Sequence, residues 1–181
     1  YLNLQSSLVV DVSGNFWSVS GSLGDWAPKS GIYKYDGTSW TNYTFNSNPI
    51  LGNSCCGWVN VYPDRSGNMW VSGWGNGLLK ISGNDLTKYD ENNSILKAVG
   101  GPGFVLTYGA DEDNSGNLWV VNNFVTNSIV NFTQQLSYPP PIGGTASFFT
   151  SMAIDNFNTK WMTLHPIEGN VRGLMYFNEG T

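Results

Sequence analysis

The sequence predicts an all-β protein, a β-propeller of about four blades with four antiparallel strands in each. Two observations carry this prediction. A turn motif that ends in Trp recurs four times, and its copies are spaced like propeller blades. The composition agrees, because the 181 residues include 22 glycines and 14% aromatic residues but only 12% charged ones. Turn-forming residues mixed with aromatic and β-branched ones are typical of short strands joined by tight turns.

The recurring element has the pattern Asp-x-Ser-Gly-Asn-x-Trp. An Asp carboxylate that accepts backbone N–H groups starts a turn, and Gly or Asn tolerates the positive φ of a tight hairpin. We therefore expect the four aspartates to be structural turn residues and not catalytic ones. The fourth copy keeps Asp and Trp but has Asn-Thr in place of Gly-Asn. The four pairs are Asp11 and Trp17, Asp64 and Trp70, Asp113 and Trp119, and Asp155 and Trp161.

Two more strands are predicted after each Trp-bearing strand. The third strand follows a Gly, as at 31–35 and 77–81, and the fourth has Trp or Leu three residues before Tyr, as at 40–43 and 86–89. The Trp-to-Trp spacings of 53, 49 and 42 residues are close to the about 40 to 50 residues of one blade. We expect residues 1–181 to form one propeller segment, with repeat units at roughly 6–45, 57–91, 104–138 and 149–181.

The size of the ring is a separate question. The Trp-bearing strands are apolar on both faces, as at 118–121, which fits blades stacked face to face around an axis. The sequence stops where the fourth unit should continue into its last strand. We therefore expect an arc of a larger, seven- or eight-bladed ring. The alternative is a closed four-bladed ring in which residues 1–4 supply the last strand.

Charge and cysteine content exclude several functions. The net charge is −5, and no basic cluster suits a nucleic acid. No apolar run approaches the roughly 20 residues of a membrane span. Cys55 and Cys56 are adjacent, which favours two reduced thiols over a strained disulfide pair. With His165 as the only histidine, we expect no metal site and no cofactor.

Candidate interaction residues are sought in the long, irregular loops, because propellers bind through loops at the ends of the ring. Exposed aromatic rings there could stack on a sugar or a protein, although packing in the core is the more frequent role of a Trp. The candidates are Trp26, Trp58, Trp74 and His165. We expect no catalytic residue, because one histidine and scattered carboxylates form no recognisable catalytic arrangement.

The motif and the following Gly-Ile/Leu-x-Lys segment resemble the two-component-regulator propeller repeat, which is abundant in Bacteroidetes. The resemblance covers essentially the whole chain. Within this class the sequence is similar to the PorZ family. The similar runs are Trp17-Ser-Val-Ser-Gly-Ser-Leu-Gly-Asp-Trp26-Ala-Pro28, Asp36-Gly-Thr-Ser-Trp-Thr-Asn-Tyr43, Gly116-Asn-Leu-Trp-Val-Val-Asn-Asn-Phe124 and Gly173-Leu-Met-Tyr-Phe-Asn178. The family offers no short catalytic or ligand motif that could be transferred to this chain.

The resemblance implies a non-catalytic binding or scaffolding propeller in a cell-surface secretion complex. PorZ proteins are surface components of the type IX secretion system. The implied partners are proteins of that complex and anionic lipopolysaccharide or another glycan, presented to a sortase, at the outer membrane. The alternative is a periplasmic oligosaccharide-sensing propeller of a hybrid two-component system. A glycoside-processing enzyme ranks third, because a sialidase needs three arginines and this chain has only Arg65 and Arg172.

Overall fold

The computed structural model describes residues 7–21, 31–52, 57–141, 148–165 and 173–179. These residues form antiparallel strands and one short 3-10 helix, η1 (Pro49–Leu51). The strands are β1 (Ser7–Val10), β2 (Phe16–Val19), β3 (Ile32–Tyr35), β4 (Trp40–Tyr43), β5 (Trp58–Pro63), β6 (Met69–Gly75), β7 (Gly77–Ser82), β8 (Asp85–Tyr89), β9 (Val105–Glu112), β10 (Leu118–Asn122), β11 (Ile129–Asn131), β12 (Leu136–Tyr138), β13 (Phe149–Ile154), β14 (Lys160–Leu164) and β15 (Gly173–Phe177).

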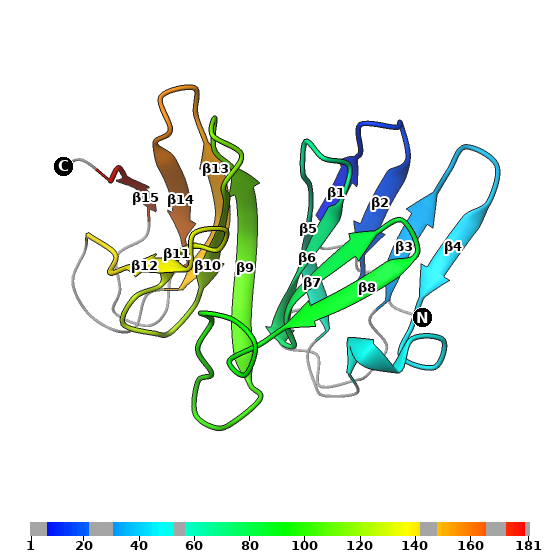
Figure 1. Cartoon of the computed structure of the whole chain (residues 1–181), viewed down its shortest axis with the longest axis horizontal. Coiled ribbons are helices and arrows are strands. Elements are labelled where there is room, and N and C mark those ends of the chain that lie inside the picture. The colour runs from blue at the N-terminus through cyan, green and yellow to red at the C-terminus, as the bar shows by residue number, and fades with distance from the viewer. Residues whose placement is uncertain (1–6, 22–30, 53–56, 142–147, 166–172, 180–181) are drawn as a thin grey trace.

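The strands form four consecutive blades. Blade 1 is β1–β4, blade 2 is β5–β8, blade 3 is β9–β12 and blade 4 is β13–β15, each a meander of neighbouring strands. A short pairing of β6 with β9 joins the sheets of blades 2 and 3. Blades 1 and 4 lie at opposite ends of the arc (Figure 1). The prediction of an all-β propeller arc is confirmed.

Each of the four Asp turns closes the hairpin between the first and second strands of its blade. In blade 3, Asp113 Oδ1 accepts the N–H groups of Ser115 and Asn117, and Oδ2 accepts the indole N–H of Trp119 at 2.9 Å. The same Asp-to-Trp hydrogen bond is 2.8–2.9 Å long in the other three blades. The third residue after each Asp has a positive φ: 81° at Gly14, 84° at Gly67, 81° at Gly116 and 63° at Asn158. The motif therefore ties its Asp to its Trp as well as forming the turn.

These turns should make the stability of the protein sensitive to acid. Burial alone would raise the pKa of Asp11 and Asp113, but the hydrogen bonds from the Asn and Trp of each turn lower it below the ordinary 3.8. The indole N–H of Trp161 is the main cause of the lowered pKa of Asp155. A carboxyl group whose pKa is lower in the folded state stabilises the fold above the unfolded pKa. That contribution is lost as the pH falls through the folded pKa.

We expect the melting temperature to be nearly constant from pH 7 to 5 and to fall steeply below about pH 4, where unfolded Asp takes up its proton. Thermal melts followed by circular dichroism from pH 7 to 2.5 would measure this. Asp113→Asn should flatten the acid limb, because the amide has no proton to gain there. A melting temperature unchanged down to pH 3 would contradict the prediction.

The cores lie between blades and repeat the same contact three times. In blades 1 to 3 the repeat Trp stacks on the Tyr of the fourth strand, with ring centroids 5.8–6.0 Å apart: Trp17 on Tyr43, Trp70 on Tyr89 and Trp119 on Tyr138. Each pair belongs to one hydrophobic cluster with a residue of the next blade that lies in its third strand or directly after it. These residues are Ile81 in blade 2, Phe132 in blade 3 and Phe177 in blade 4. One face of each blade thus presents a Trp, and in blades 2 to 4 the other face packs against the Trp of the blade before it.

A lysine covers the repeat Trp in these three interfaces. Lys34 and Lys80 approach Trp17 and Trp70 from their own blades, with the ammonium 5.2 and 5.3 Å from the ring. In blade 3 the cation comes from blade 4: Lys160 Nζ lies 3.8 Å from the centre of Trp119 and 3.0 Å from a carboxylate oxygen of Glu179. Lys160 is fully buried. A buried ammonium requires such partners, because desolvation penalises an unpaired charge.

The Asp turns also contact one another along the arc. In blades 2 and 3 the residue after the Asp forms the hydrogen bonds to the next turn. Arg65 donates its backbone N–H to Glu112 Oε2 at 2.8 Å, and its guanidinium donates to the backbone carbonyls of Glu112 and Asp113. Asn114 donates to the side-chain oxygen of Asn158 and to the carbonyl of Asn156. Successive blades are therefore joined at this end by polar contacts.

Candidate binding surface

The arc has two ends with different structures. The four Asp turns gather at one end, the upper side of Figure 1. The opposite end, here called the loop face, carries the connections from second to third strand and from one blade to the next. It includes residues 90–104 and 123–128. Ligands of propellers bind at such loops, so the loop face is where the candidate site must be sought.

A β-bulge lies near the loop face in the first strand of blades 2, 3 and 4. In blade 2 the register shifts between Trp58 and Asn60 of β5, and in blade 4 it shifts between Phe149 and Ser151 of β13. In blade 3 the shift lies in β9, opposite Val120 to Asn122 of β10. In blade 3 the extra residue falls at Tyr108-Gly109. Gly109 has φ 78°, and a Cβ there would lie 2.8 Å from the backbone N of Met152, so only Gly fits. The bulges bring blades 3 and 4 close together below the loop face and redirect nearby side chains.

Near these bulges, polar side chains form hydrogen bonds between neighbouring blades. Asn123 pairs with the backbone of Phe149 in both directions: its Nδ2 donates to the Phe149 carbonyl at 3.0 Å, and its Oδ1 accepts the Phe149 N–H at 2.9 Å. Thr107 links blade 3 to blade 2, since its hydroxyl donates to the carbonyl of Gly77 and accepts the N–H of Gly73. Asn123 and Thr107 are both fully buried. They hold the base of the loop face rigid.

Five rings gather above these joints and form what we call the loop-face aromatic cluster: Trp74 from blade 2, Tyr108 and Phe124 from blade 3, and Phe148 and His165 from blade 4. Phe148 lies at its centre and contacts the other four, with ring centroids 5.0 Å from Trp74, 5.6 Å from Phe124, 6.4 Å from Tyr108 and 4.8 Å from His165. Trp74 also meets Phe124 edge to face at 6.0 Å. Three blades thus contribute to one cluster.

The cluster is partly open to solvent. Phe148 is buried, Trp74, Tyr108 and Phe124 are half-buried, and His165 is exposed. Phe124 has φ 61°, a conformation that costs a bulky side chain free energy and is concentrated at functional sites. Burial raises the pKa of the Tyr108 phenol, which stays neutral at physiological pH. Such rings offer neutral faces for stacking on the C–H face of a sugar or on apolar side chains.

The structure brings together two of the four candidates from the sequence. Trp74 and His165 meet through Phe148 in the cluster. Trp58 is only 1% exposed and packs in the core between blades 1 and 2, where it stabilises the blade contact. Trp26 lies outside the described residues, as do Cys55 and Cys56. The aspartates Asp11, Asp64, Asp113 and Asp155 are all in the turns, at the end away from the cluster.

Phe124, Phe148 and Tyr108 were not predicted from the sequence. One regularity of the sequence could have indicated the region: Trp74, Asn123 and His165 each stand four residues after a repeat Trp. Their backbone N–H groups donate to equivalent carbonyls, those of Gly57, Leu106 and Phe148. In blades 2 and 4 this position places an aromatic side chain in the cluster, and in blade 3 it places the buried Asn123 beneath it. The carbonyl of Phe148 is one of these acceptors. An alignment of the first strands of the blades, in addition to the Trp-bearing second strands, could have indicated Phe148 from the sequence.

The described residues include neither a cluster of metal-ligating side chains nor a helix that could span a membrane. No group of three or more His, Cys, Asp or Glu side chains in these ranges could hold a metal ion. Within the same ranges no helix has the length and apolar character needed to cross a membrane.

Fold and repeated turn together define the chain as an arc of a β-propeller. No protein-family model matches the sequence, and no curated protein is detectably similar to it. Solved structures are similar. PorZ, a surface component of the type IX secretion system of Porphyromonas gingivalis, superposes with a TM-score of 0.79 at 23% identity, over 99% of this chain and 26% of PorZ. The resemblance read from the sequence is thus confirmed at the level of the fold.

Two other kinds of protein share the architecture. The extracellular domain of the two-component system protein BT4673 from B. thetaiotaomicron has a TM-score of 0.65 at 16% identity, over 97% of this chain and 24% of that one. Virginiamycin B lyase from Staphylococcus aureus has a TM-score of 0.63 at 13% identity, over 99% of this chain and 57% of the lyase. The chain spans about a quarter of PorZ and of the BT4673 domain. The same fold therefore occurs in a secretion component, a two-component system protein and an enzyme.

Proposed function

We propose that this propeller arc is a non-catalytic binding module of an exported bacterial cell-surface protein, and that its loop face binds a glycan of the lipopolysaccharide type. The observation that carries the proposal is the loop-face aromatic cluster. Rings from three blades converge at the end of the arc where propellers bind, on a base fixed by Asn123 and Thr107. The PorZ-like fold supports a place in a type IX secretion complex at the outer membrane.

The non-catalytic character is part of the proposal, because the lyases have the same fold. One of the similar structures is a catalytically inactive histidine-to-alanine variant of virginiamycin B lyase. The single histidine of this chain, His165, lies against Phe148, with ring centroids 4.8 Å apart. Within the described residues its imidazole forms no hydrogen bond or ion pair with a carboxylate. The environment of His165 thus supports stacking and hydrogen bonding to a ligand more than proton transfer.

A test of the proposal is isothermal titration of the chain with purified anionic lipopolysaccharide and with its polysaccharide freed of lipid. We expect saturable binding and a loss of affinity of about tenfold or more for Trp74→Ala, since an aromatic anchor contributes more than about 1.4 kcal/mol when truncated. Phe157→Ala is the matched control. Its ring is 85% exposed, but it lies in an Asp turn at the far end of the arc.

The outcomes separate the alternatives. Equal affinities of Trp74→Ala and the parent chain would place the ligand elsewhere, and no saturable binding of either probe would overturn the glycan proposal. The BT4673-like fold supports a second function, the sensing of a free oligosaccharide in the periplasm. In that case short neutral oligosaccharides should bind through Trp74 more tightly than the anionic polymer does.

A further inference from the structure

Of the basic side chains in the described part of the chain, all but one contact other parts of the fold. Three lysines lie over the rings of repeat tryptophans: Lys34, Lys80 and Lys160. The guanidinium of Arg65 donates to carbonyls of the next Asp turn, and Lys88 Nζ lies against Gly52. The exception is Lys97, in the 90–104 segment of the loop face. Its side chain is exposed, and its ammonium forms no ion pair or hydrogen bond with a described residue.

The backbone of Lys97 is nevertheless held firmly. Asn122 Oδ1 accepts the Lys97 N–H at 2.7 Å, and Asn122 Nδ2 donates to the Lys97 carbonyl at 3.2 Å. Asn122 is only 1% exposed, and it forms the same two-way pairing that Asn123 forms with blade 4. Leu96 and Ala98, on either side of Lys97, pack in the core between blades 2 and 3. The Lys97 side chain is therefore directed away from that core, because neighbouring side chains of an extended segment point to opposite sides.

The same amide places Lys97 beside the loop-face aromatic cluster. Asn122 Nδ2 also donates to the carbonyl of Leu106 at 3.2 Å, and Leu106 is the strand-pairing partner of Trp74. Asn122 itself ends β10, two residues before Phe124. One buried side chain thus joins the backbone of Lys97 to the two segments that carry Trp74 and Phe124.

The charge of Lys97 is not neutralised within its loop. Asp90 Oδ1 accepts the backbone N–H and the side-chain amide of Asn92, and Glu91 Oε1 accepts the backbone N–H of Gly103. Both acids are thus bonded to the loop and not to the ammonium. The chain as a whole carries a net charge of −5, which repels anions at long range. An anionic ligand of the loop face therefore needs a local cation with free donors.

We propose that Lys97 is the residue by which the loop face selects anionic glycans. The rings of the cluster stack on a sugar, and the Lys97 ammonium binds a carboxylate or phosphate substituent on that sugar or its neighbour. A neutral glycan would use the rings alone. This inference rests on the proposed function of the loop face, and it adds which part of the ligand is recognised and by which side chain.

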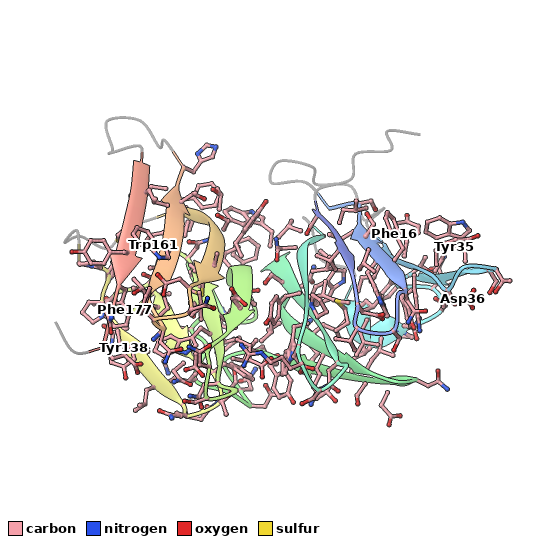
Figure 2. The ribbon with its side chains drawn as sticks, turned by 90° about the horizontal axis from the view of Figure 1, so that it is seen from above. Phe16, Tyr35, Asp36, Tyr138, Trp161 and Phe177 are labelled. Atoms are coloured by element: carbon pink, nitrogen blue, oxygen red, sulfur yellow. The ribbon has the colours of Figure 1, made fainter. Side chains whose placement is uncertain are left out.

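The test compares two substitutions at this position. Lys97→Gln removes the charge at similar length, and Lys97→Arg keeps it. Asn84→Asp is the matched control, because it lowers the net charge by one, as Lys97→Gln does, in the exposed β7–β8 turn at the end of the arc away from the loop face. The equivalent turn of blade 1 carries Asp36, at the rim of the arc in Figure 2, so an acid is compatible with this turn.

The probes are the lipid-free anionic polysaccharide and two derivatives of it, one with its carboxyl groups reduced and one dephosphorylated. We expect Lys97→Gln to bind the polysaccharide about fivefold more weakly than the parent chain at low ionic strength. This difference should disappear at about 1 M salt, where exposed charges are screened. Lys97→Arg and Asn84→Asp should bind like the parent. The derivative that lacks the recognised group should bind the parent and Lys97→Gln equally, which identifies that group as carboxylate or phosphate.

The failure of this inference can be told from the failure of the proposed function. If Trp74→Ala weakens binding but Lys97→Gln binds the polysaccharide as the parent does, the inference is wrong and the glycan site stands. If the parent binds no probe, both are wrong. A loss in Lys97→Arg as large as that in Lys97→Gln, or an equal loss in Asn84→Asp, would also overturn the inference, because the local charge would then not be the cause.

Discussion

Replacing Asn123 by Ala is expected to destabilise the protein by about 2–5 kcal/mol, because two buried backbone groups lose their partners at once. The amide of Asn123 is the hydrogen-bond partner of both the N–H and the C=O of Phe149, and Phe149 is fully buried. An Ala side chain can replace neither bond. For a chain of this length the loss corresponds to a fall of roughly 5–15 °C in melting temperature.

The position of Asn123 adds a functional consequence. Phe149 follows Phe148, the central ring of the loop-face aromatic cluster, so a loosened joint should also weaken binding at that surface. Asn127→Ala is the matched control, because Asn127 is exposed and its amide donates only to Ser137, at 3.4 Å. Denaturant titration of both variants measures the difference. Equal stabilities of the two variants would show that Asn123 does not hold blades 3 and 4 together.

Asp113→Ala is the second change with a large expected effect. Asp113 accepts the indole N–H of Trp119, whose side chain is fully buried, together with two backbone N–H groups of the turn. Without the carboxylate the indole donor has no partner and no access to water. We expect a loss of about 3 kcal/mol, the sum of a charge-assisted hydrogen bond and an unsatisfied buried donor.

Asp155→Ala offers an internal comparison with the same chemistry. Asp155 holds Trp161 by an equivalent hydrogen bond of 2.9 Å, but Trp161 is 36% exposed and its indole N–H can turn to water. We expect this variant to lose less than about 1 kcal/mol. Urea unfolding of the two variants at pH 7 measures the contrast. If both changes cost the same, the motif would act only through its turn, and burial of the Trp would be irrelevant.

Most of the fold could be predicted from the sequence because the repeat encodes local structure. The Asp and Trp of each turn act within seven residues, and the Tyr of the fourth strand follows the Trp by 26, 19 and 19 residues in blades 1 to 3. The exposure of Trp161 could not be predicted from the motif. Trp119 and Trp161 occupy the same repeat position, yet one is fully buried and the other is 36% exposed, since only Trp119 has a blade packed on it. Burial here depends on the neighbouring blade.

The candidate site was predicted less completely, and for a physical reason. The loop-face aromatic cluster brings together residues 74, 108, 124, 148 and 165, from three blades, and the sequence gives no distances between loops. Trp58 and Trp74 stand close together in the sequence, but one belongs to a buried core and the other to the cluster. The bulge in the first strand decides which side chains face outward, and nothing in the composition of that strand reveals it.

The contacts of Arg65 imply that the order of the blades is encoded in the protein. The backbone N–H of Arg65 donates to the side-chain carboxylate of Glu112, which stands seven residues before Trp119. The same position holds Val10, Pro63 and Ile154 in the other blades, and none of these side chains can accept a hydrogen bond. If blade 2 docked against the wrong neighbour during folding, the backbone N–H of Arg65 would face an apolar side chain instead of the Glu112 carboxylate. Repeats similar enough to share one fold are thereby kept from exchanging places, which is a characteristic failure of tandem-repeat proteins.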